Sequence, residues 1–345
     1  RSAQSLTESY SSILKPGQDR DKIKEELASR FVNINAGNAK YDELSIIEIL
    51  RKELPEKLYS QSDNSIEISE ILLSDKLLKQ IGDTGAGLAQ EERKKLIEKV
   101  LACRKSDGGF SWFAGMKSSI YVTAALLENF AAMRDDLPAE IEELIPDAIL
   151  YMHKECKKDD ELYLYIRALY RDLEVPKARI ASGVLGKYAK DTRTGILAKA
   201  RKIFILKSFG YDRQDERELE SLAQYAVSHS SGGIYYPNAV MPWRGLMESE
   251  LHAHVLLCRI LDSYGRSELA EGIRLWIMIQ KETQRWEGDP AFIAAAATVI
   301  EGKEETLATK IAILSTEKEL DFDQIKANGN VKNVVIDLSN NGGGS

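Results

Sequence analysis

Cysteine and histidine are the side chains of this sequence that could act as nucleophiles or hold a transition metal. His254 and Cys258 lie four positions apart, and His153 and Cys156 lie three apart, so each pair shares one face of a predicted helix. Zinc accepts both imidazole and thiolate ligands. No third or fourth ligand is evident beside either pair. We therefore predict no metal site and assign these residues to the helix interior.

Paired carboxylates are the other possible source of chemistry. Glu248 and Glu250 stand two positions apart, which points them to different sides of a helix, and we interpret them as first-turn acids that favour the helix dipole. The clusters at 159–161 and 321–323 could protonate a substrate in a deep cavity, but neither falls on a predicted inner helix. No Gly-x-Ser-x-Gly elbow is present. We predict no catalytic residue and no cofactor.

Composition places the chain among ordinary globular proteins. It has 345 residues, 43% of them hydrophobic, and a net charge of -7, which argues against nucleic acid as the partner. No apolar run reaches about 18 residues, so no membrane span is predicted. Three widely spaced cysteines are poor material for a disulfide framework.

Helical periodicity dominates residues 1–302. The segments 118–131, 248–261 and 291–300 are apolar over most of their circumference, which is typical of helices buried among others, and Ser118 or Ser119 can cap the first. Other helices keep one polar side; these are 140–153, 161–172, 193–209, 213–229 and 267–280. Two concentric layers, with the apolar helices inside and the amphipathic ones outside, would explain the alternation.

The two ends of the chain look different from each other. Residues 1–105 are predicted to be helical, with a short strand or loop within 60–74. After residue 303 the β-branched segments 310–314 and 331–338 predict strands, joined by a turn at Asn328-Gly329-Asn330. We therefore divide the chain into a helical domain, 1–302, and a β tail, 303–345, which could begin a separate sheet domain.

A short sequence pattern, a Gly-Gly turn followed by aromatic residues, occurs twice. Gly108-Gly109 and Gly232-Gly233 are each followed by an apolar residue, aromatic residues and then a helix-forming run. We interpret both as turns at the rim of the helical layers. Aromatic residues in or near such loops form a candidate contact surface for a partner, although packing over the ends of the inner helices is the alternative; they are Trp112, Phe113, Tyr235, Tyr236, Trp243 and Trp286.

These blocks carry a resemblance to a known family. Gly108 to Leu127, Met241-Pro242-Trp243 with the helix after it, and Trp286 leading into 290–295 resemble the thioester-containing helical domain of bacterial α2-macroglobulin-like proteins. In that family a Gly/Trp-rich loop precedes a Thr- and Ala-rich inner helix. The resemblance covers about 77–300. It implies an all-α fold, an α/α toroid with a short β tail, inside a large extracytoplasmic protein of the periplasm or cell envelope built from many β-domains.

The sequence departs from the family at its reactive element. The family closes an internal thioester within Cys-x-Glu-Gln, whereas none of the three cysteines here precedes such a sequence. The resemblance therefore implies a non-enzymatic, thioester-lacking domain that acts in protease trapping or inhibition without a covalent bond. Its expected partners are other domains of the same polypeptide and target proteases, with a lipid anchor ahead of the chain as an option. A toroid lyase, hydrolase or transferase with a central-cavity site, and a surface-binding scaffold, remain alternatives.

Overall fold

A computed structural model of the chain describes residues 5–31, 39–192, 195–211, 215–229, 232–240, 249–283, 291–319 and 335–336. Within these ranges the protein is mostly helical, with a small antiparallel sheet, as the sequence predicts. No helix among the described residues is long and apolar enough to cross a membrane.

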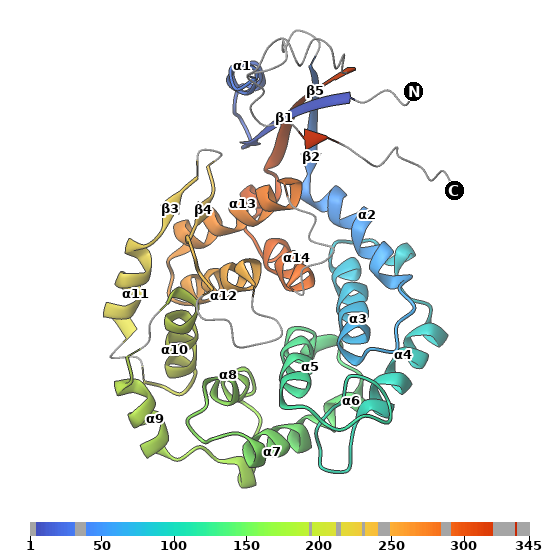
Figure 1. Ribbon diagram of the computed structural model, residues 1–345, viewed down its shortest axis with the longest axis vertical. Helices are drawn as coiled ribbons and strands as arrows, with labels where there is room; N and C mark the ends of the chain where they lie inside the picture. Colours follow the sequence, from blue (N-terminus) through green and yellow to red (C-terminus); the bar gives the residue numbers. More distant parts are fainter. Residues whose placement is uncertain are drawn as a thin grey trace.

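One set of helices surrounds the middle of the molecule (Figure 1). Each of them packs on the next, α3 on α5, α5 on α8, α8 on α10, α10 on α12 and α12 on α14, and α14 returns to α3, so that the contacts form a closed circuit. These inner helices are α3 (Ser65–Gln80), α5 (Ile120–Ala132), α8 (Glu161–Leu169), α10 (Ile196–Ser208), α12 (Glu250–Ser263) and α14 (Phe292–Ile300).

A second set of helices lies around the first. Figure 1 shows them outside the inner helices, and each packs on the inner helix next to it in the chain. They are α2 (Ile46–Leu58), α4 (Gln90–Cys103), α7 (Ile145–Glu155), α9 (Ser182–Lys190), α11 (Asp215–Gln224) and α13 (Ser267–Thr283). Short turns complete the connections; they are η2 (Thr84–Ala86), η3 (Arg134–Asp136), α6 (Ala139–Glu142), η4 (Pro176–Ala178) and α15 (Glu304–Leu307).

Burial follows the predicted pattern for the most apolar helices. The three segments that are apolar on most sides become α5, α12 and α14, all of them inner helices. By contrast, the outer helix α4 buries only Val100 and Cys103. Serine caps begin two of the inner helices, because the side chain of Ser119 accepts from the Val122 N–H and that of Ser249 accepts from the His252 N–H.

Two helices with polar residues depart from the predicted layering. The segments 161–172 and 193–209 were expected outside, but α8 and α10 lie in the inner set. Their charged side chains are buried with them: Arg167 and Arg201 are each 6% exposed, and Lys202 is 3% exposed. Lys202 donates to Glu218 at 2.7 Å and to the Asp191 carbonyl at 2.9 Å, so its charge is compensated inside the protein.

The segment 60–74 was also assigned wrongly. Instead of a strand or loop, most of it forms α3, which begins after the cap residue Asn64. Polar residues in this segment weakened the helical pattern in the sequence, but their hydrogen-bonding groups have partners within the helix. The Ser69 hydroxyl donates to the Ile66 carbonyl, and the Ser74 hydroxyl donates to the Glu70 carbonyl. Serines that bond to their own helix can be buried at little cost.

A sheet lies beyond α2 and α13 (Figure 1). Its strands are β1 (Ser5–Leu14), β2 (Lys40–Ser45), β5 (Lys310–Glu319) and β6 (Val335–Ile336), in the order β2-β5-β1-β6 with all neighbours antiparallel. Ser9 lies opposite Ser315 in the register. Helix α1 (Arg20–Ala28) packs Ile23 and Leu27 against residues of β1 and β5.

The tail prediction is confirmed for 310–314 and for 335–336, whereas the predicted turn at 328–330 lies outside the described residues. The expectation that residues 1–105 are helical is wrong at β1 and β2, which supply two of the four strands. The division of the chain at residue 302 stays a prediction. A further hairpin, β3 (Val227–Ser228) with β4 (Ile234–Tyr235), surrounds the second Gly-Gly turn.

Candidate functional site

The first Gly-Gly turn joins α4 to α5 and packs against α7. Gly108 has a φ of +93°, and a Cβ on it would lie 2.6 Å from the Asp147 carbonyl oxygen. A Cβ on Gly109 would lie 2.8 Å from the ring of Tyr151. Glycine is therefore required at Gly108 by backbone conformation and at both positions by space.

Hydrogen bonds fix the base of this loop. The Phe110 N–H donates to the Thr123 hydroxyl at 2.9 Å, in the first turns of α5. The Ser65 hydroxyl donates to the Ser111 carbonyl at 2.8 Å, and the Ser65 N–H donates to the Trp112 carbonyl at 2.9 Å. The loop is thus anchored to the beginnings of α3 and α5, which holds the residues after it in place.

The second turn uses its glycines in the same way. Gly232 has a φ of +97°, and a Cβ on Gly233 would lie 2.7 Å from Cα of Trp276 in α13. The segment after this turn is hydrogen-bonded to the inner helix α12, because the Tyr236 N–H donates to Nε2 of His254 at 2.9 Å. In both turns the first glycine therefore has a left-handed backbone conformation, and the second glycine lies in close contact with an outer helix.

The predicted aromatic contact residues that the structure describes differ in exposure. Phe113 is 45% exposed, and Trp112 is partly buried against the core. At the second turn, Tyr236 is 1% exposed and Tyr235 stacks on Trp276 with ring centroids 6.2 Å apart. Trp243 and Trp286 lie outside the described residues. The packing alternative therefore describes Tyr235 and Tyr236, and Phe113 is the exposed candidate.

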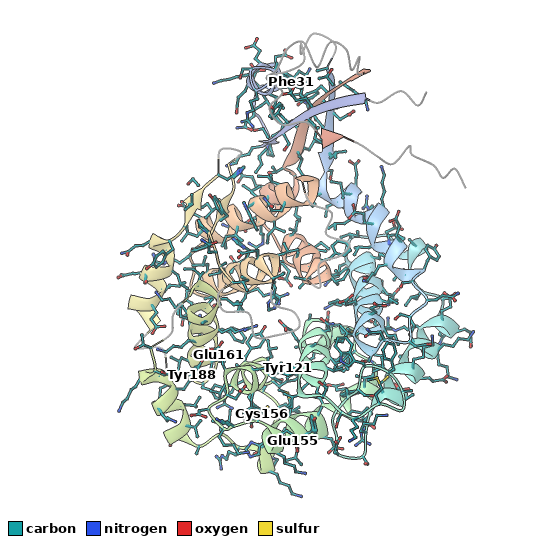
Figure 2. The ribbon with its side chains drawn as sticks, in the orientation of Figure 1. Phe31, Tyr121, Glu155, Cys156, Glu161 and Tyr188 are labelled. Atoms are coloured by element: carbon teal, nitrogen blue, oxygen red, sulfur yellow. The ribbon has the colours of Figure 1, made fainter. Side chains whose placement is uncertain are left out.

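Two exposed residues near Phe113 were missed. Met116 is 48% exposed and Tyr121, at the beginning of α5, is 52% exposed; Figure 2 labels Tyr121 beside that helix. We call residues 113–121 the rim segment. The signal that could have found Met116 is its loop, which is polar and contains Gly115, so that no apolar pattern predicts a buried position for a large side chain there.

A charged cluster that sequence reasoning also missed joins three inner helices. One carboxylate oxygen of Glu128 in α5 accepts from the Tyr165 hydroxyl of α8 and from Nε2 of His252 in α12, both at 2.8 Å. Tyr165 and His252 are 1% and 2% exposed. Arg201 of α10 places its guanidinium 5.4 Å from the Tyr165 ring centre. Spacing along the chain gives no sign that these residues meet.

Electrostatics keeps this carboxylate ionised. Burial by itself raises the pKa of Glu128, but attraction to His252 and the hydrogen bonds from His252 and Tyr165 outweigh burial and lower that pKa to about 2. Burial and the Glu128 charge in turn raise the pKa of Tyr165. No described residue bonds to Nδ1 of His252. The arrangement fixes one anion between three helices, which suits a structural clamp.

The histidine of each histidine–cysteine pair has a hydrogen-bond partner. His254 donates Nδ1–H to the Glu250 carbonyl at 2.6 Å and accepts at Nε2 from Tyr236, so both ring nitrogens are occupied. Burial lowers its pKa to about 4, which keeps the ring neutral at physiological pH. In the other pair, His153 bonds through Nδ1 to the Tyr163 hydroxyl at 2.6 Å. Among the described residues no group of three or more His, Cys, Asp or Glu could hold a metal.

Burial favours the protonated form of all three thiols. Burial raises the pKa of Cys156 to about 11 and that of Cys258 to about 12, and it also raises the pKa of Cys103. Because the thiolate is the nucleophile, a raised pKa suppresses attack at neutral pH. Figure 2 labels Cys156 and Glu155 at the end of α7.

The carboxylates considered as catalytic have local partners. Glu250 stands in the first turn of α12 and accepts from the backbone N–H groups of Ala239 and Val240, both at 3.2 Å. In the cluster at 159–161, Asp160 caps α8 and Glu161 accepts from the Tyr188 hydroxyl at 3.4 Å, a pair seen side by side in Figure 2. Glu248 and the cluster at 321–323 lie outside the described residues.

Comparison with solved structures identifies the fold. The chain is similar to native α2-macroglobulin from Escherichia coli spanning domain MG7 to the C-terminus, at 14% identity and a TM-score of 0.55, over 91% of this chain and 57% of that one. Salmonella α2-macroglobulin reacted with methylamine gives 12% identity and a TM-score of 0.54, over 91% and 24%. The native E. coli protein gives 13% and 0.51, over 92% and 23%.

These likenesses show that the chain shares a fold with part of bacterial α2-macroglobulin. The sequence itself matches no protein-family model and no curated protein. The chain spans about a quarter of the length of the longer structures it matches.

Proposed function

We propose that this chain is a non-enzymatic helical domain of an α2-macroglobulin-like protein and acts through protein–protein contacts. The observation that carries the proposal is the rim segment, where Phe113, Met116 and Tyr121 are exposed next to an anchored loop. Large apolar side chains held in place outside a core are typical of contact surfaces. The closed circuit of inner helices supports describing the fold as an α/α toroid.

The occupant that we propose for the rim segment is a neighbouring domain of the same polypeptide. The likeness to bacterial α2-macroglobulin supports this, because the matched structures extend well beyond the part that this chain resembles. The role of the whole protein would then be protease trapping or inhibition at the bacterial cell envelope, outside the cytoplasm. A lipid anchor ahead of this chain belongs to the same proposal.

Trapping by this protein would be non-covalent. The sequence has no Cys-x-Glu-Gln, and the three thiols have raised pKa values. A thiol held in its protonated form within a helix is poorly suited to carry an acyl group. The proposal therefore depends on shape and contact, and it predicts no bond between this chain and a captured protease.

The test uses the polypeptide that contains this chain, incubated with trypsin. Trapping predicts that trypsin keeps its activity on a small chromogenic peptide but loses activity on a large protein substrate. Denaturing gels should show no adduct between the two proteins. The double substitution Phe113→Ser with Tyr121→Ser should weaken the protection at least fivefold, because it removes the apolar side chains that hold the neighbouring domain.

Tyr225→Ser is the matched control, because Tyr225 is 53% exposed and follows α11, which lies across the molecule from α4 and α5 in Figure 1. It should leave the protection unchanged. An unmodified polypeptide that does not protect the large substrate would overturn the trapping role and favour a scaffold. A denaturation-resistant adduct would overturn the non-covalent mechanism, and equal effects of the two variants would overturn the role of the rim segment.

A further inference from the structure

A cavity of about 540 Å³ opens between the end of α8, the helix α9 and the end of α10. Apolar groups form much of its wall, among them Val175, Leu185 and Phe209. Its size falls in the range of cavities that hold small organic molecules. The cavity lies apart from the rim segment and from the Glu128 cluster, and neither the fold nor the proposed contacts account for it.

Arg167 is the unusual member of this wall. Its side chain is nine-tenths buried, at 6% exposed, yet its Nε and Nη1 atoms find no acceptor among the described residues. A buried guanidinium with two unpaired nitrogens is costly, because its desolvation is only partly offset by hydrogen bonds. Burial lowers the pKa of Arg167, and the charge of Arg171 lowers it further. Both effects would be relieved by a bound anion.

The remaining charges of the wall leave it net positive. Arg171 and Arg179 also line the cavity and are exposed. Two carboxylates oppose them, but Asp172 is already engaged by Arg134 at 2.8 Å, outside the set of lining residues. Glu174 is exposed at the surface. An anion that entered would therefore meet three guanidinium groups and one free carboxylate.

We propose that this cavity binds a small organic carboxylate, with its carboxyl group on Arg167 and its apolar body along Val175, Leu185 and Phe209. A guanidinium forms charge-assisted hydrogen bonds with carboxylate oxygens, and these are stronger than hydrogen bonds between neutral groups. The apolar wall selects against a bare inorganic anion, which would gain nothing from it. The site is independent of protease trapping and stands or falls by itself.

The test is calorimetric titration of the full chain with octanoate, with octan-1-ol and inorganic phosphate as separate probes. Octanoate should bind and raise the melting temperature, whereas octan-1-ol and phosphate should each bind at least tenfold more weakly. Arg167→Met should reduce octanoate affinity at least tenfold. The same variant without ligand should melt at or above the temperature of the unmodified chain, since it removes a buried charge that has two unpaired nitrogens.

Lys177→Gln is the matched control, because it removes one positive charge from the neighbouring turn η4 without touching the cavity wall. It should change octanoate affinity less than twofold. Phosphate binding as tight as octanoate binding would overturn the organic ligand, and octan-1-ol binding as tight would overturn the role of the charge. Equal affinity of the Arg167→Met variant and the unmodified chain would overturn the site. If the Arg167→Met variant does not fold, Arg171→Gln tests the role of positive charge in octanoate binding instead, because Arg171 lines the cavity at an exposed position.

Discussion

At the scale of single residues, Glu128 shows how a charge can hold helices together. Its carboxylate accepts from side chains of α8 and α12, so three inner helices meet at one oxygen. The pKa lowered to about 2 means that the folded protein prefers the ionised form. Such a group links stability to pH, because unfolding releases the carboxyl to its ordinary affinity for protons.

The lowered pKa of Glu128 predicts that the folded protein loses stability in acid. A carboxyl with a depressed folded pKa stabilises the protein above its ordinary value of 4.5, and this contribution is lost as the pH falls toward about 2. Denaturant unfolding at pH 6 and pH 2 should show that Glu128→Gln removes about 2–3 kcal/mol of this pH dependence. Glu98→Gln, at an exposed position on α4, should leave the profile unchanged. An unchanged acid limb in the Glu128 variant would contradict the clamp.

At the scale of elements, the Gly-Gly turns set how close loops come to outer helices. In both turns the second glycine has no space for a Cβ, which would touch the Tyr151 ring of α7 in one case and the Trp276 backbone of α13 in the other. A contact with backbone is the harder of the two to relieve. The turn at Gly233 therefore fixes the distance between β4 and α13.

Gly233→Ala should separate these two elements. Its Cβ would lie 2.7 Å from Cα of Trp276, so the loop or the helix must move, and we expect a loss of about 2–3 kcal/mol in the free energy of unfolding. Gly186→Ala, inside α9 with open space around it, should instead stabilise by about 0.5–1 kcal/mol. Chemical denaturation of both variants makes the comparison, and similar effects would contradict the close approach.

At the scale of the whole molecule, the sheet joins distant parts of the chain. β5 pairs with β1 on one side and with β2 on the other, although more than 260 residues separate β2 from β5. The sheet has its own small core with α1, whereas Ile13 of β1 and Ile311 of β5 pack into the main helical core. The N-terminal strands therefore depend on the C-terminal segment for their hydrogen bonds.

Removal of residues 303–345 tests this dependence and the predicted domain division together. β1 and β2 lose their pairing partners, so hydrogen exchange at 5–14 and 40–45 should accelerate at least a hundredfold. The inner helices α5 and α12 should keep their protection. Removal of 337–345 alone leaves every described strand and should change neither. Loss of protection in α5 and α12 would contradict a helical domain that ends at residue 302.

The sequence by itself determined the parts of this protein that depend on neighbours along the chain. Helices apolar on most sides, the Ser119 cap and the two Gly-Gly turns all follow from local spacing and backbone conformation. Phe113 was also among the predicted contact residues.

Only the tertiary structure decided which polar groups enter the interior and which distant segments meet. The sequence predicts α8 and α10 to be surface helices, because the charges of Arg167 and Arg201 are costly to bury. Burial becomes tolerable only when another helix or a ligand compensates the charge, and the sequence does not show such a partner. The segment of β1 was predicted to be helical because a strand is stabilised by the residues of the strand that it pairs with. Its partner β5 lies at the other end of the chain, so the local sequence does not show the pairing. The carboxylate clamp and the arginine cavity arise in the same way, from side chains brought together by packing alone.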